Sequence, residues 1–346
     1  MKYEMKYNVT CNTDDNYAQH CCAMLCSLFE NNKDLIFHIH LLIKKLNEEN
    51  LKSINELCKK YHNEITIYTV NESKLEGVKF RKNRPLTKAA YYRILLPEIL
   101  DKNIDKILYL DCDIIVLGSV KELYEIELND YALAACQDAS PYTELHRRQL
   151  GLDLQSKAFC SGLMMINIKY WRENNSVDRL IEYSKRDREI VYLHDQDALN
   201  YVFKNKWYVL PYKWGKAPYS IAIIDGRQKQ FDIDEYVYNA RILHYASPLK
   251  PWFDVWTPDQ KYYTKYLSMS GYPNCVFTHV NKSTRIKAWI SNVRYYLNRY
   301  IHPLIPNIIE IFILDIFNII VLMFIIVFKS RSLNKKLLKQ WLRKYK

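Results

Sequence analysis

Glycine is scarce in this chain, whose 346 residues include only seven glycines, all far apart. No two have the spacing of the G-x-G-x-x-G loop that binds dinucleotides or the G-x-x-x-x-G-K-[ST] loop that binds ATP. A phosphate group bound here would therefore need a metal ion, lysine or arginine side chains, or the N-terminus of a helix.

The nine cysteines include no C-x-x-C pair, and their odd number argues against a complete disulfide framework. We therefore expect reduced thiols, as in cytosolic proteins. The first eight residues carry charges and lack the apolar segment of a secretory signal, which also predicts a cytoplasmic protein.

The formal charge of +12 does not indicate a nucleic-acid partner, because the excess lies at one end of the chain. Residues 329–346 carry eight basic side chains and no acidic one, and the remainder has a formal charge of +4. We therefore expect no nucleic-acid partner.

The order of apolar runs and helical patterns predicts an α/β fold. Along residues 7–70 they alternate as βαβαβ, which is typical of a mostly parallel sheet. A helix is predicted from Thr87, and an apolar strand over 107–116 follows it. Further strands are predicted over 131–135, 162–168, 207–210 and 242–245, and helices over 176–186 and 195–203. The character of the sequence changes after Asp259, so we divide the chain into a catalytic domain, 1–271, and a helical C-terminal region, 272–346.

Two C-terminal segments predict association with a membrane. Residues 308–328 are long enough to span one, yet Glu310, Asp315 and Asn318 interrupt them, and an Asp at mid-membrane costs about 2.5–3.5 kcal/mol. Residues 329–346 place apolar side chains at helical spacing among the eight positive charges, which suits an anionic lipid surface. The alternative is a buried or dimer-forming helix with a solvated tail. We favour peripheral attachment to the inner face of the cell membrane and leave open whether 308–328 spans it.

Asp111 and Asp113 interrupt an apolar strand and are the sharpest local signal of chemistry. Two buried carboxylates must be neutralised, and at the end of a strand both can reach one divalent cation. Such a cation would also bind diphosphate oxygens. It would thereby take the role that a glycine-rich loop has in other nucleotide-binding proteins. By itself a D-x-D triplet is equally compatible with an exposed turn.

Six short segments, in order from Asn12 to Trp252, resemble glycosyltransferase family 8. This family includes bacterial lipopolysaccharide galactosyl- and glucosyltransferases and glycogenin. The segments are 12–17 (NTDDNY), 90–93 (AYYR), 108–113 (LYLDCD), 159–163 (FCSGL), 194–200 (HDQDALN) and 244–252 (HYASPLKPW). The resemblance implies a single Rossmann-like, GT-A-type domain that binds a UDP-sugar donor and acts on a glycan or glycolipid acceptor.

The resemblance also assigns the nucleoside and metal sites. It implies that Asn12, Asp14 and Asn16 contact the nucleoside and that Tyr17 stacks on the uracil base. The implied ligands of the metal, Mn²⁺ or Mg²⁺, are Asp111, Asp113 and His244. Cys112, also in the donor-binding set, is expected to point its thiol away from the metal.

The remaining implied roles concern the diphosphate and the sugar. Arg93 and Lys250 would contact the diphosphate, and Ser161 belongs to the donor-binding set. Asp195 would hold sugar hydroxyls and Gln196 would lie near the anomeric carbon. Arg93, Asp195 and Gln196 are therefore the candidate catalytic residues, and transfer with retention of anomeric configuration is expected. We favour a front-face substitution over a double displacement, because an amide is a poor covalent nucleophile.

Two residues depart from the family pattern. Cys160 replaces an asparagine beside the sugar, and Ser247 replaces a common glycine. The alternatives are a metal-dependent phosphohydrolase, a membrane-associated UDP-binding module with a degenerate site and, within the family, self-glycosylation on a tyrosine. The sequence does not distinguish galactose from glucose.

Overall fold

The computed structural model describes residues 6–80, 88–138, 142–153, 156–187, 191–216 and 239–296. The chain forms two compact units, Met1–His279 and Val280–Lys346, and the described part of the second consists mainly of helix α11 (Lys282–Tyr296). The two segments that the sequence predicts to associate with a membrane, 308–328 and 329–346, lie outside the described residues. Among the described residues, no helix combines the length and apolar character needed to cross a membrane.

A seven-stranded sheet, in the order β3-β2-β1-β4-β7-β6-β8, runs through the first unit. The neighbouring strands are parallel except where β7 pairs with β4 and β6, so the predicted α/β fold with a mostly parallel sheet is confirmed. Its strands are β1 (Lys6–Asn12), β2 (Ile36–Ile43), β3 (Glu64–Thr69), β4 (Lys106–Leu110), β6 (Leu133–Cys136), β7 (Leu163–Asn167) and β8 (Trp207–Leu210).

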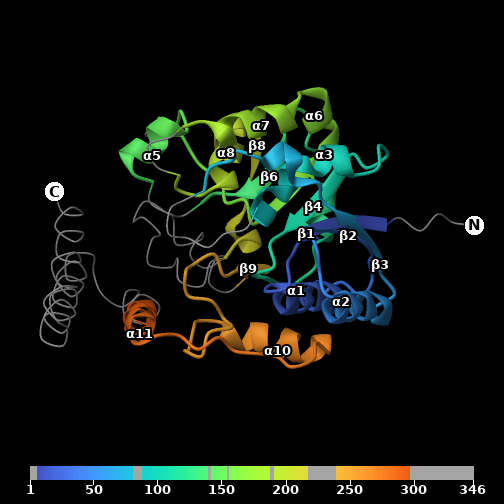
Figure 1. Ribbon diagram of the computed structural model, residues 1–346, viewed down its shortest axis with the longest axis vertical. Helices are drawn as coiled ribbons and strands as arrows, with labels where there is room; N and C mark the ends of the chain where they lie inside the picture. The colour runs from blue at the N-terminus through green and yellow to red at the C-terminus, as the bar shows by residue number, and fades with distance from the viewer. Residues whose placement is uncertain are drawn as a thin grey trace, which may run out of the picture. The chain divides into compact units, whose positions relative to one another are not determined.

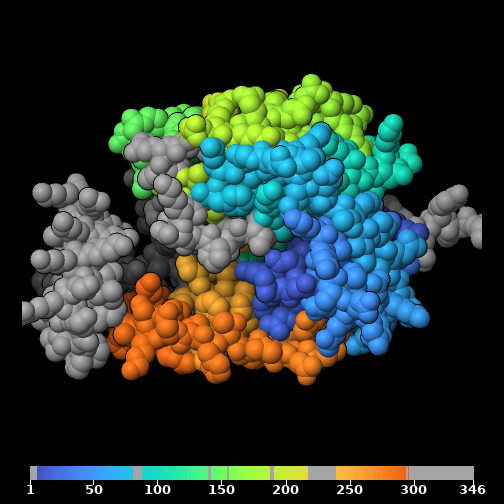
Figure 2. Space-filling model, in the orientation of Figure 1, coloured from blue at the N-terminus to red at the C-terminus, as the bar shows by residue number. Residues whose placement is uncertain are grey.

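Helices cover both faces of this sheet (Figure 1). One layer holds α1 (Ala18–Glu30), α2 (Glu48–Lys60) and α10 (Gln260–Ser270). The other holds η2 (Lys88–Leu95), α3 (Leu96–Ile99), α6 (Ile168–Glu173), α7 (Ser176–Lys185) and α8 (Asp195–Phe203). Shorter helices lie in the connections: η1 (Glu72–Leu75), α4 (Lys121–Glu125), α5 (Glu144–Gln149) and η3 (Tyr212–Trp214). In Figure 2 the yellow-green surface of α6 and α7 and the orange surface of α10 lie on opposite sides of the blue N-terminal elements.

Alternation along the strands divides the core between these two layers. In β4, Leu108 and Leu110 pack into the cluster that includes α1, whereas Ile107 and Tyr109 pack into the cluster that includes α7 and α8. Successive side chains of a strand point to opposite faces, so a strand covered on both sides must be apolar throughout. This explains the uninterrupted apolar run before Asp111.

The sequence predicts one strand over 107–116, but the structure contains two. β4 ends at Leu110, and β5 (Ile114–Val116) pairs with β9 (Ile242–His244) in a separate two-stranded sheet. The Ile114 amide donates to the Asp111 carbonyl, which closes a turn between the two strands. The two aspartates therefore lie at the carboxyl end of β4 rather than inside a strand.

Two other expectations need adjustment or stay open. The helix predicted from Thr87 is the 3₁₀ helix η2, and α3 starts afresh beside Pro97, which has no N–H to extend the earlier turn. The division at Gly271 stays a prediction. There α10 has just ended, and the Thr278 backbone still bonds to Trp252 and Asp254 in the first compact unit.

Arg172 in α6 fixes the loop that leads into β4. Its guanidinium donates five hydrogen bonds of 2.9–3.1 Å to backbone carbonyls, which are those of Pro97, Leu100, Asp101, Lys102 and Ile104. All five N–H groups of the side chain are used, and the planar fork presents them in a fixed geometry.

We expect Arg172→Lys to lower the free energy of unfolding by about 2–3 kcal/mol, because an ammonium group cannot satisfy five carbonyls at once. Urea denaturation of the two proteins measures this. Arg179→Lys is the matched control, since Arg179 lies on α7 and makes one long bond, of 3.5 Å, to the Val202 carbonyl. Equal losses in both variants would contradict the role assigned to Arg172.

Candidate functional site

The predicted nucleoside segment and the two aspartates meet at one edge of the sheet. Asn12 ends β1 and Asp111 follows β4, and these strands are parallel neighbours. The Tyr109 hydroxyl lies between them, 2.5 Å from Asn12 Oδ1 and 2.7 Å from Asp111 Oδ1. A buried tyrosine therefore fixes the two segments relative to each other.

The small β5–β9 sheet brings His244 to the aspartates. Ile114 pairs with His244, and the Tyr245 amide donates to the Asp113 carbonyl at 2.9 Å. His244 Nε2 lies 3.2 Å from Asp113 Oδ1 and 3.8 Å from Asp111 Oδ2. The three side chains can each offer one atom within 4.8 Å of the others, so they fit around a single divalent cation.

Gly162 is required for the position of His244. A Cβ atom at residue 162 would lie 2.1 Å from His244 Cε1 and 2.6 Å from Nε2. The imidazole ring therefore packs directly on the glycine backbone. The Gly162 carbonyl also accepts from the Asp111 amide at 2.8 Å, which connects this segment to the end of β4.

Positive side chains compensate the acidic ones. Lys250 Nζ donates to Asp113 Oδ2 and to the Tyr245 carbonyl, both at 2.7 Å. Burial opposes ionisation of Asp113, but Lys250 and His244 outweigh it and hold the pKa of this carboxyl well below its usual range. Burial also lowers the pKa of His244, but Cys160 and Asp113 more than reverse this effect and raise it. A cation that bound His244 would therefore displace a proton.

Arg93 connects the D-x-D turn to the other half of the site. Only 4% of this residue is exposed, and its guanidinium lies over the Tyr109 ring, 4.1 Å from the ring centre. It contacts Asp111 Oδ1 at 2.8 Å and Asp195 Oδ2 at 3.1 Å, and donates to the Ser161 carbonyl at 2.7 Å. One buried cation thus orients two carboxylates from different elements.

The amide of Gln196 is held from both ends. Its Oε1 accepts from the Ser161 amide at 2.9 Å and from the Ser161 hydroxyl at 3.2 Å. Its Nε2 donates to Asp138 Oδ2 at 2.8 Å and to the Tyr142 hydroxyl at 3.1 Å. The side chain is therefore fixed in one orientation, which suits binding more than covalent chemistry.

The two acids of the 194–200 segment occupy different environments. Burial raises the pKa of Asp195 to about 6; Arg93 opposes this shift and Asp111 adds to it. Asp197 accepts from the Tyr192 and Leu193 amides at the start of α8 and contacts His146 Nε2 at 2.8 Å. Asp197 therefore supports the fold, and Asp195 is the acid that faces the site through Arg93.

The 12–17 segment forms the turn into α1. Asp14 Oδ1 accepts from the Asn16 and Tyr17 amides, at 3.0 and 3.1 Å. Asn16 is exposed, and Tyr17 is 39% exposed with its ring edge-on to Trp252. Cys112 is buried, and its thiol donates to the Asn12 carbonyl at 3.2 Å.

The structure thus gathers Asn12, Arg93, Asp111, Asp113, Ser161, Asp195, Gln196, His244 and Lys250 around one end of the sheet, and the ligand-binding role of each stays a prediction. The sequence reasoning gave no role to Tyr109 and Gly162, although both lie in the quoted segments, and it missed Asp138 and Tyr142 altogether. Tyr109 could have been found, because a tyrosine in a fully buried strand needs a hydroxyl partner. No sequence pattern around Asp138 or Tyr142 indicates that they belong to the site.

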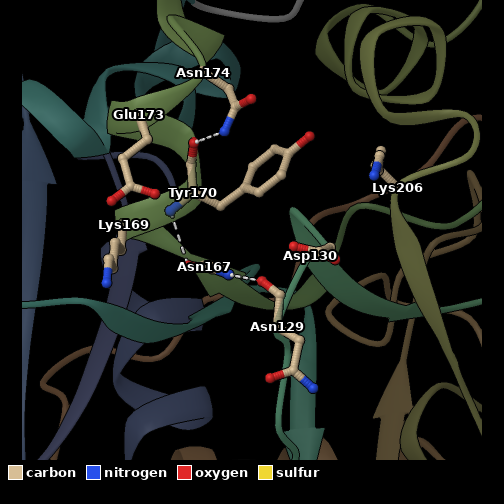
Figure 3. Close-up of a pocket in the computed structure, with 8 residues that line it drawn as sticks. All are labelled: Asn129, Asp130, Asn167, Lys169, Tyr170, Glu173, Asn174 and Lys206. Atoms are coloured by element: carbon tan, nitrogen blue, oxygen red, sulfur yellow. Dashed lines mark hydrogen bonds between the residues drawn. The ribbon is translucent and has the colours of Figure 1, made fainter.

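A polar cavity of about 580 Å³ lies at the opposite edge of the sheet (Figure 3). It is lined by Asn129, Asp130, Asn167, Lys169, Tyr170, Glu173, Asn174 and Lys206. Asn167 is the last residue of β7 and Trp207 the first of β8, whereas the aspartates follow the last residue of β4. The dashed bonds in Figure 3 join residues of this lining: Asn167 accepts from the Tyr170 amide and donates to the Asn129 carbonyl, and Asn174 donates to the Tyr170 carbonyl. This cavity is therefore separate from the D-x-D site.

Comparison with known proteins gives the family. Residues 8–255 match the model of glycosyl transferase family 8. The chain belongs to this family. The match includes all of the gathered site residues, so the predicted resemblance is confirmed.

Several curated relatives are similar over most of their length. General stress protein A of Bacillus subtilis is 30% identical over 261 residues, which are 72% of this chain and 88% of that protein. A lipopolysaccharide 1,2-glucosyltransferase of Escherichia coli is 27% identical, with 72% and 74% covered. A lipopolysaccharide 1,3-galactosyltransferase of Salmonella typhimurium is 25% identical, with 84% and 90% covered.

The fold also occurs among solved structures. The galactosyltransferase LgtC, solved with donor and acceptor sugar analogues, matches with a TM-score of 0.67 and 24% identity, over 80% of this chain and 99% of LgtC. At this level of identity the match establishes the GT-A-like α/β fold. The chain is therefore a family 8 glycosyltransferase with a possible metal site formed by two aspartates and a histidine.

The raised pKa of Asp195 predicts a pH-dependent stability in the metal-free protein. The folded protein keeps this proton up to about pH 6, whereas the usual value is 3.8, so the folded state binds more protons between these values. Stability from this group is therefore present at low pH and is lost as pH rises to about 6, by on the order of 2–3 kcal/mol in total.

Asp195→Asn removes this titration. In urea unfolding with EDTA, we expect the stability of the variant relative to the unchanged protein to increase as pH rises from about 4 to about 7. Asp34→Asn, the same substitution at an exposed aspartate outside the site, serves as the control. A constant or falling difference for Asp195→Asn would show that the carboxyl is not disfavoured by burial.

Proposed function

We propose that this glycosyltransferase moves a hexose, galactose or glucose, from a UDP-sugar to a glycan acceptor with retention at the anomeric carbon. The observation that supports this most is the grouping of Asp111, Asp113 and His244 at the end of β4, with Lys250 and Arg93 beside them. Retention is inferred from the family resemblance.

The metal-ligand set selects the class of ion. Two carboxylates and one imidazole suit Mn²⁺ or Mg²⁺, and the nitrogen ligand favours manganese. When bound there, such an ion supplies Lewis-acid stabilisation of charge on the departing diphosphate. Its ligands come from the β4–β5 turn and from β9, whose pairing fixes their separation.

Lys250 and Arg93 have distinct parts in donor binding. Lys250 Nζ is held beside Asp113, where it would donate to a diphosphate oxygen once the carboxylate is shared with a metal ion. Arg93 already donates hydrogen bonds to Asp111 and to the Ser161 and Ala90 carbonyls, and it is ion-paired with Asp195. Its main contribution is therefore to orient those groups toward the diphosphate and the sugar.

Asp195 and Gln196 would contact the sugar. Above its pKa of about 6, Asp195 is a buried carboxylate that can accept hydrogen bonds from sugar hydroxyls. Gln196 is fixed by Ser161, Asp138 and Tyr142, so it presents the same edge in every turnover. A rigid amide and a partly neutralised acid favour a front-face substitution assisted by the diphosphate over attack by an enzyme nucleophile.

The names of the relatives suggest the acceptor. Two of them are named as lipopolysaccharide glucosyl- and galactosyltransferases, so lipopolysaccharide or another cell-surface glycan is the proposed acceptor class. A lipid-linked acceptor of this class would suit a cytoplasmic enzyme attached peripherally to the inner face of the membrane, as the basic C-terminal segment predicts.

Asp113→Ala tests the donor site. With a panel of UDP-hexoses and Mn²⁺, we expect the unchanged protein to release UDP from one sugar and to stop when EDTA is added. The variant should lose about 10²–10³-fold in this rate, because it loses a metal ligand and the partner of Lys250. Asp34→Ala is the control, because this exposed aspartate precedes β2 at the opposite end of the strands from Asn12.

Other outcomes separate the alternatives. Release of a sugar phosphate in place of UDP would indicate a phosphohydrolase. Metal-dependent UDP binding without turnover of any sugar, with or without glycan acceptors, would indicate a binding module. Absence of UDP binding would refute a nucleotide-sugar donor.

Membrane attachment is tested by deletion of residues 308–346. These carry eight basic side chains, each contributing about 1 kcal/mol near an anionic surface. We expect co-sedimentation with vesicles of anionic lipid to fall more than tenfold while UDP-sugar hydrolysis stays unchanged. Neutral vesicles are the control, and loss of hydrolysis together with binding would argue that the segment supports the fold instead.

A further inference from the structure

The two ring nitrogens of His244 face different partners. Nε2 faces the carboxylates of Asp111 and Asp113, at 3.8 and 3.2 Å. Nδ1 faces the thiol of Cys160, with 3.5 Å between the nitrogen and the sulfur. A neutral imidazole carries its proton on one nitrogen and a lone pair on the other, so the partner of Nδ1 decides what Nε2 can do.

Hydrogen bonds hold the backbone of Cys160 and of both its neighbours. The Cys160 amide donates to the Cys136 carbonyl at 3.0 Å. The preceding residue, Phe159, bonds through both its amide and its carbonyl to the side chain of Asn200, at 2.8 and 2.9 Å. The following residue, Ser161, donates its amide to Gln196 at 2.9 Å. Three successive backbone positions are therefore fixed, which holds the Cα of Cys160 in place relative to the site.

The imidazole is confined on its face as well as at its edge. Its atoms pack against Gly162, where no Cβ could be accommodated, while the thiol lies at the Nδ1 edge. His244 lies on β9, whose pairing with β5 fixes its Cα. The backbone, one ring face and one ring nitrogen are all constrained. Together they fix the orientation of the ring and therefore the direction of Nε2.

We propose that Cys160 is a positioning residue of the metal site, whose sulfur accepts a hydrogen bond from Nδ1–H of His244 and so leaves the Nε2 lone pair directed at a cation between Asp111 and Asp113. The inference rests on the proposed function, because it concerns the ion of the donor site. Metal-ligating histidines generally donate their other N–H to a carboxylate, a backbone carbonyl or water, which fixes the tautomer and the ring orientation. Here a thiol takes that place.

The weak acceptor strength of sulfur predicts how substitutions of Cys160 should change the affinity for the metal ion. A thiol is a weak acceptor, so the orienting bond is weaker than one to an oxygen. Removing the acceptor should weaken metal binding, and replacing sulfur by an amide oxygen should preserve or strengthen it. The side chain acts through His244 and need not touch the ion, and Cys160 does not belong to the group of three residues that can surround one.

The test measures Mn²⁺ affinity directly in full-length Cys160→Ala, Cys160→Ser and Cys160→Asn. Titration with Mn²⁺ in the presence of UDP, with free Mn²⁺ read by electron paramagnetic resonance, gives a Kd without turnover. We expect the alanine variant to raise Kd about tenfold, at the lower end of the range for lost outer-shell partners. The asparagine variant should bind at least as tightly as the unchanged protein, and the serine variant should fall between.

Two controls separate positioning from folding. Cys58→Ala removes a buried thiol from α2, which carries none of the proposed metal-site residues, and should leave the Kd unchanged. Thermal unfolding midpoints of the alanine and serine variants should agree with each other, since the two side chains differ by one oxygen atom. A difference in Kd between variants of equal stability can only come from the acceptor.

Three results would contradict the proposal, and they can be distinguished from one another. If Asp113→Ala abolishes Mn²⁺ binding while every Cys160 variant keeps the original Kd, the positioning role is wrong and the metal site stands. If the unchanged protein binds no Mn²⁺ with UDP, both the proposed donor site and this inference fail. If Cys160→Ser removes a strong preference for Cd²⁺ over Mn²⁺, the thiol is itself a ligand, which also overturns the positioning role.

Discussion

The crowding of three carboxylates, one buried and two partly buried, at one end of the sheet is the constraint on which the rest of the site depends. Asp111, Asp113 and Asp195 are brought together by the fold, and each would be expensive to bury alone. Arg93 compensates Asp111 and Asp195, while Lys250 and His244 compensate Asp113. The arrangement remains unevenly balanced, since Asp113 is held strongly ionised while Asp195 is pushed toward its neutral form. A divalent cation held by Asp111, Asp113 and His244 would add positive charge to this group.

Backbone geometry makes the carboxylates converge. Because β1 and β4 are parallel, Asn12 and the D-x-D turn reach the same edge, where Tyr109 bonds to both. The antiparallel β7 begins at that edge, so the Ser161–Gly162 turn arrives beside Asp111 from the opposite direction. The antiparallel direction of β7 is thus what places Ser161 and Gly162 in the site. The absence of a side chain at Gly162 then lets His244 lie against the backbone.

The residues beyond direct reach of the aspartates explain how the site stays rigid. The Asn200 side chain bonds to both the amide and the carbonyl of Phe159, and Asp138 and Tyr142 fix the amide of Gln196. Asp197, in contact with His146 and two backbone amides, anchors the start of the helix that carries Asp195 and Gln196. Much of the 194–200 segment therefore serves orientation, and Asp195 and Gln196 alone face the site.

The sequence by itself determined the fold class, the family and which segments form the site. The pattern of apolar residues predicts whether a strand is covered on both faces. The order of the motifs along the chain predicts which strand ends carry polar residues. It did not reveal that the 107–116 run is two strands, because both halves are equally apolar and only pairing with β9 separates them. Nor did it find Asp138 and Tyr142, which become neighbours of Gln196 only through folding. The tertiary structure alone decided that Cys160 meets Nδ1 of His244, 84 residues away, because contacts between distant segments depend on strand pairing and not on local pattern.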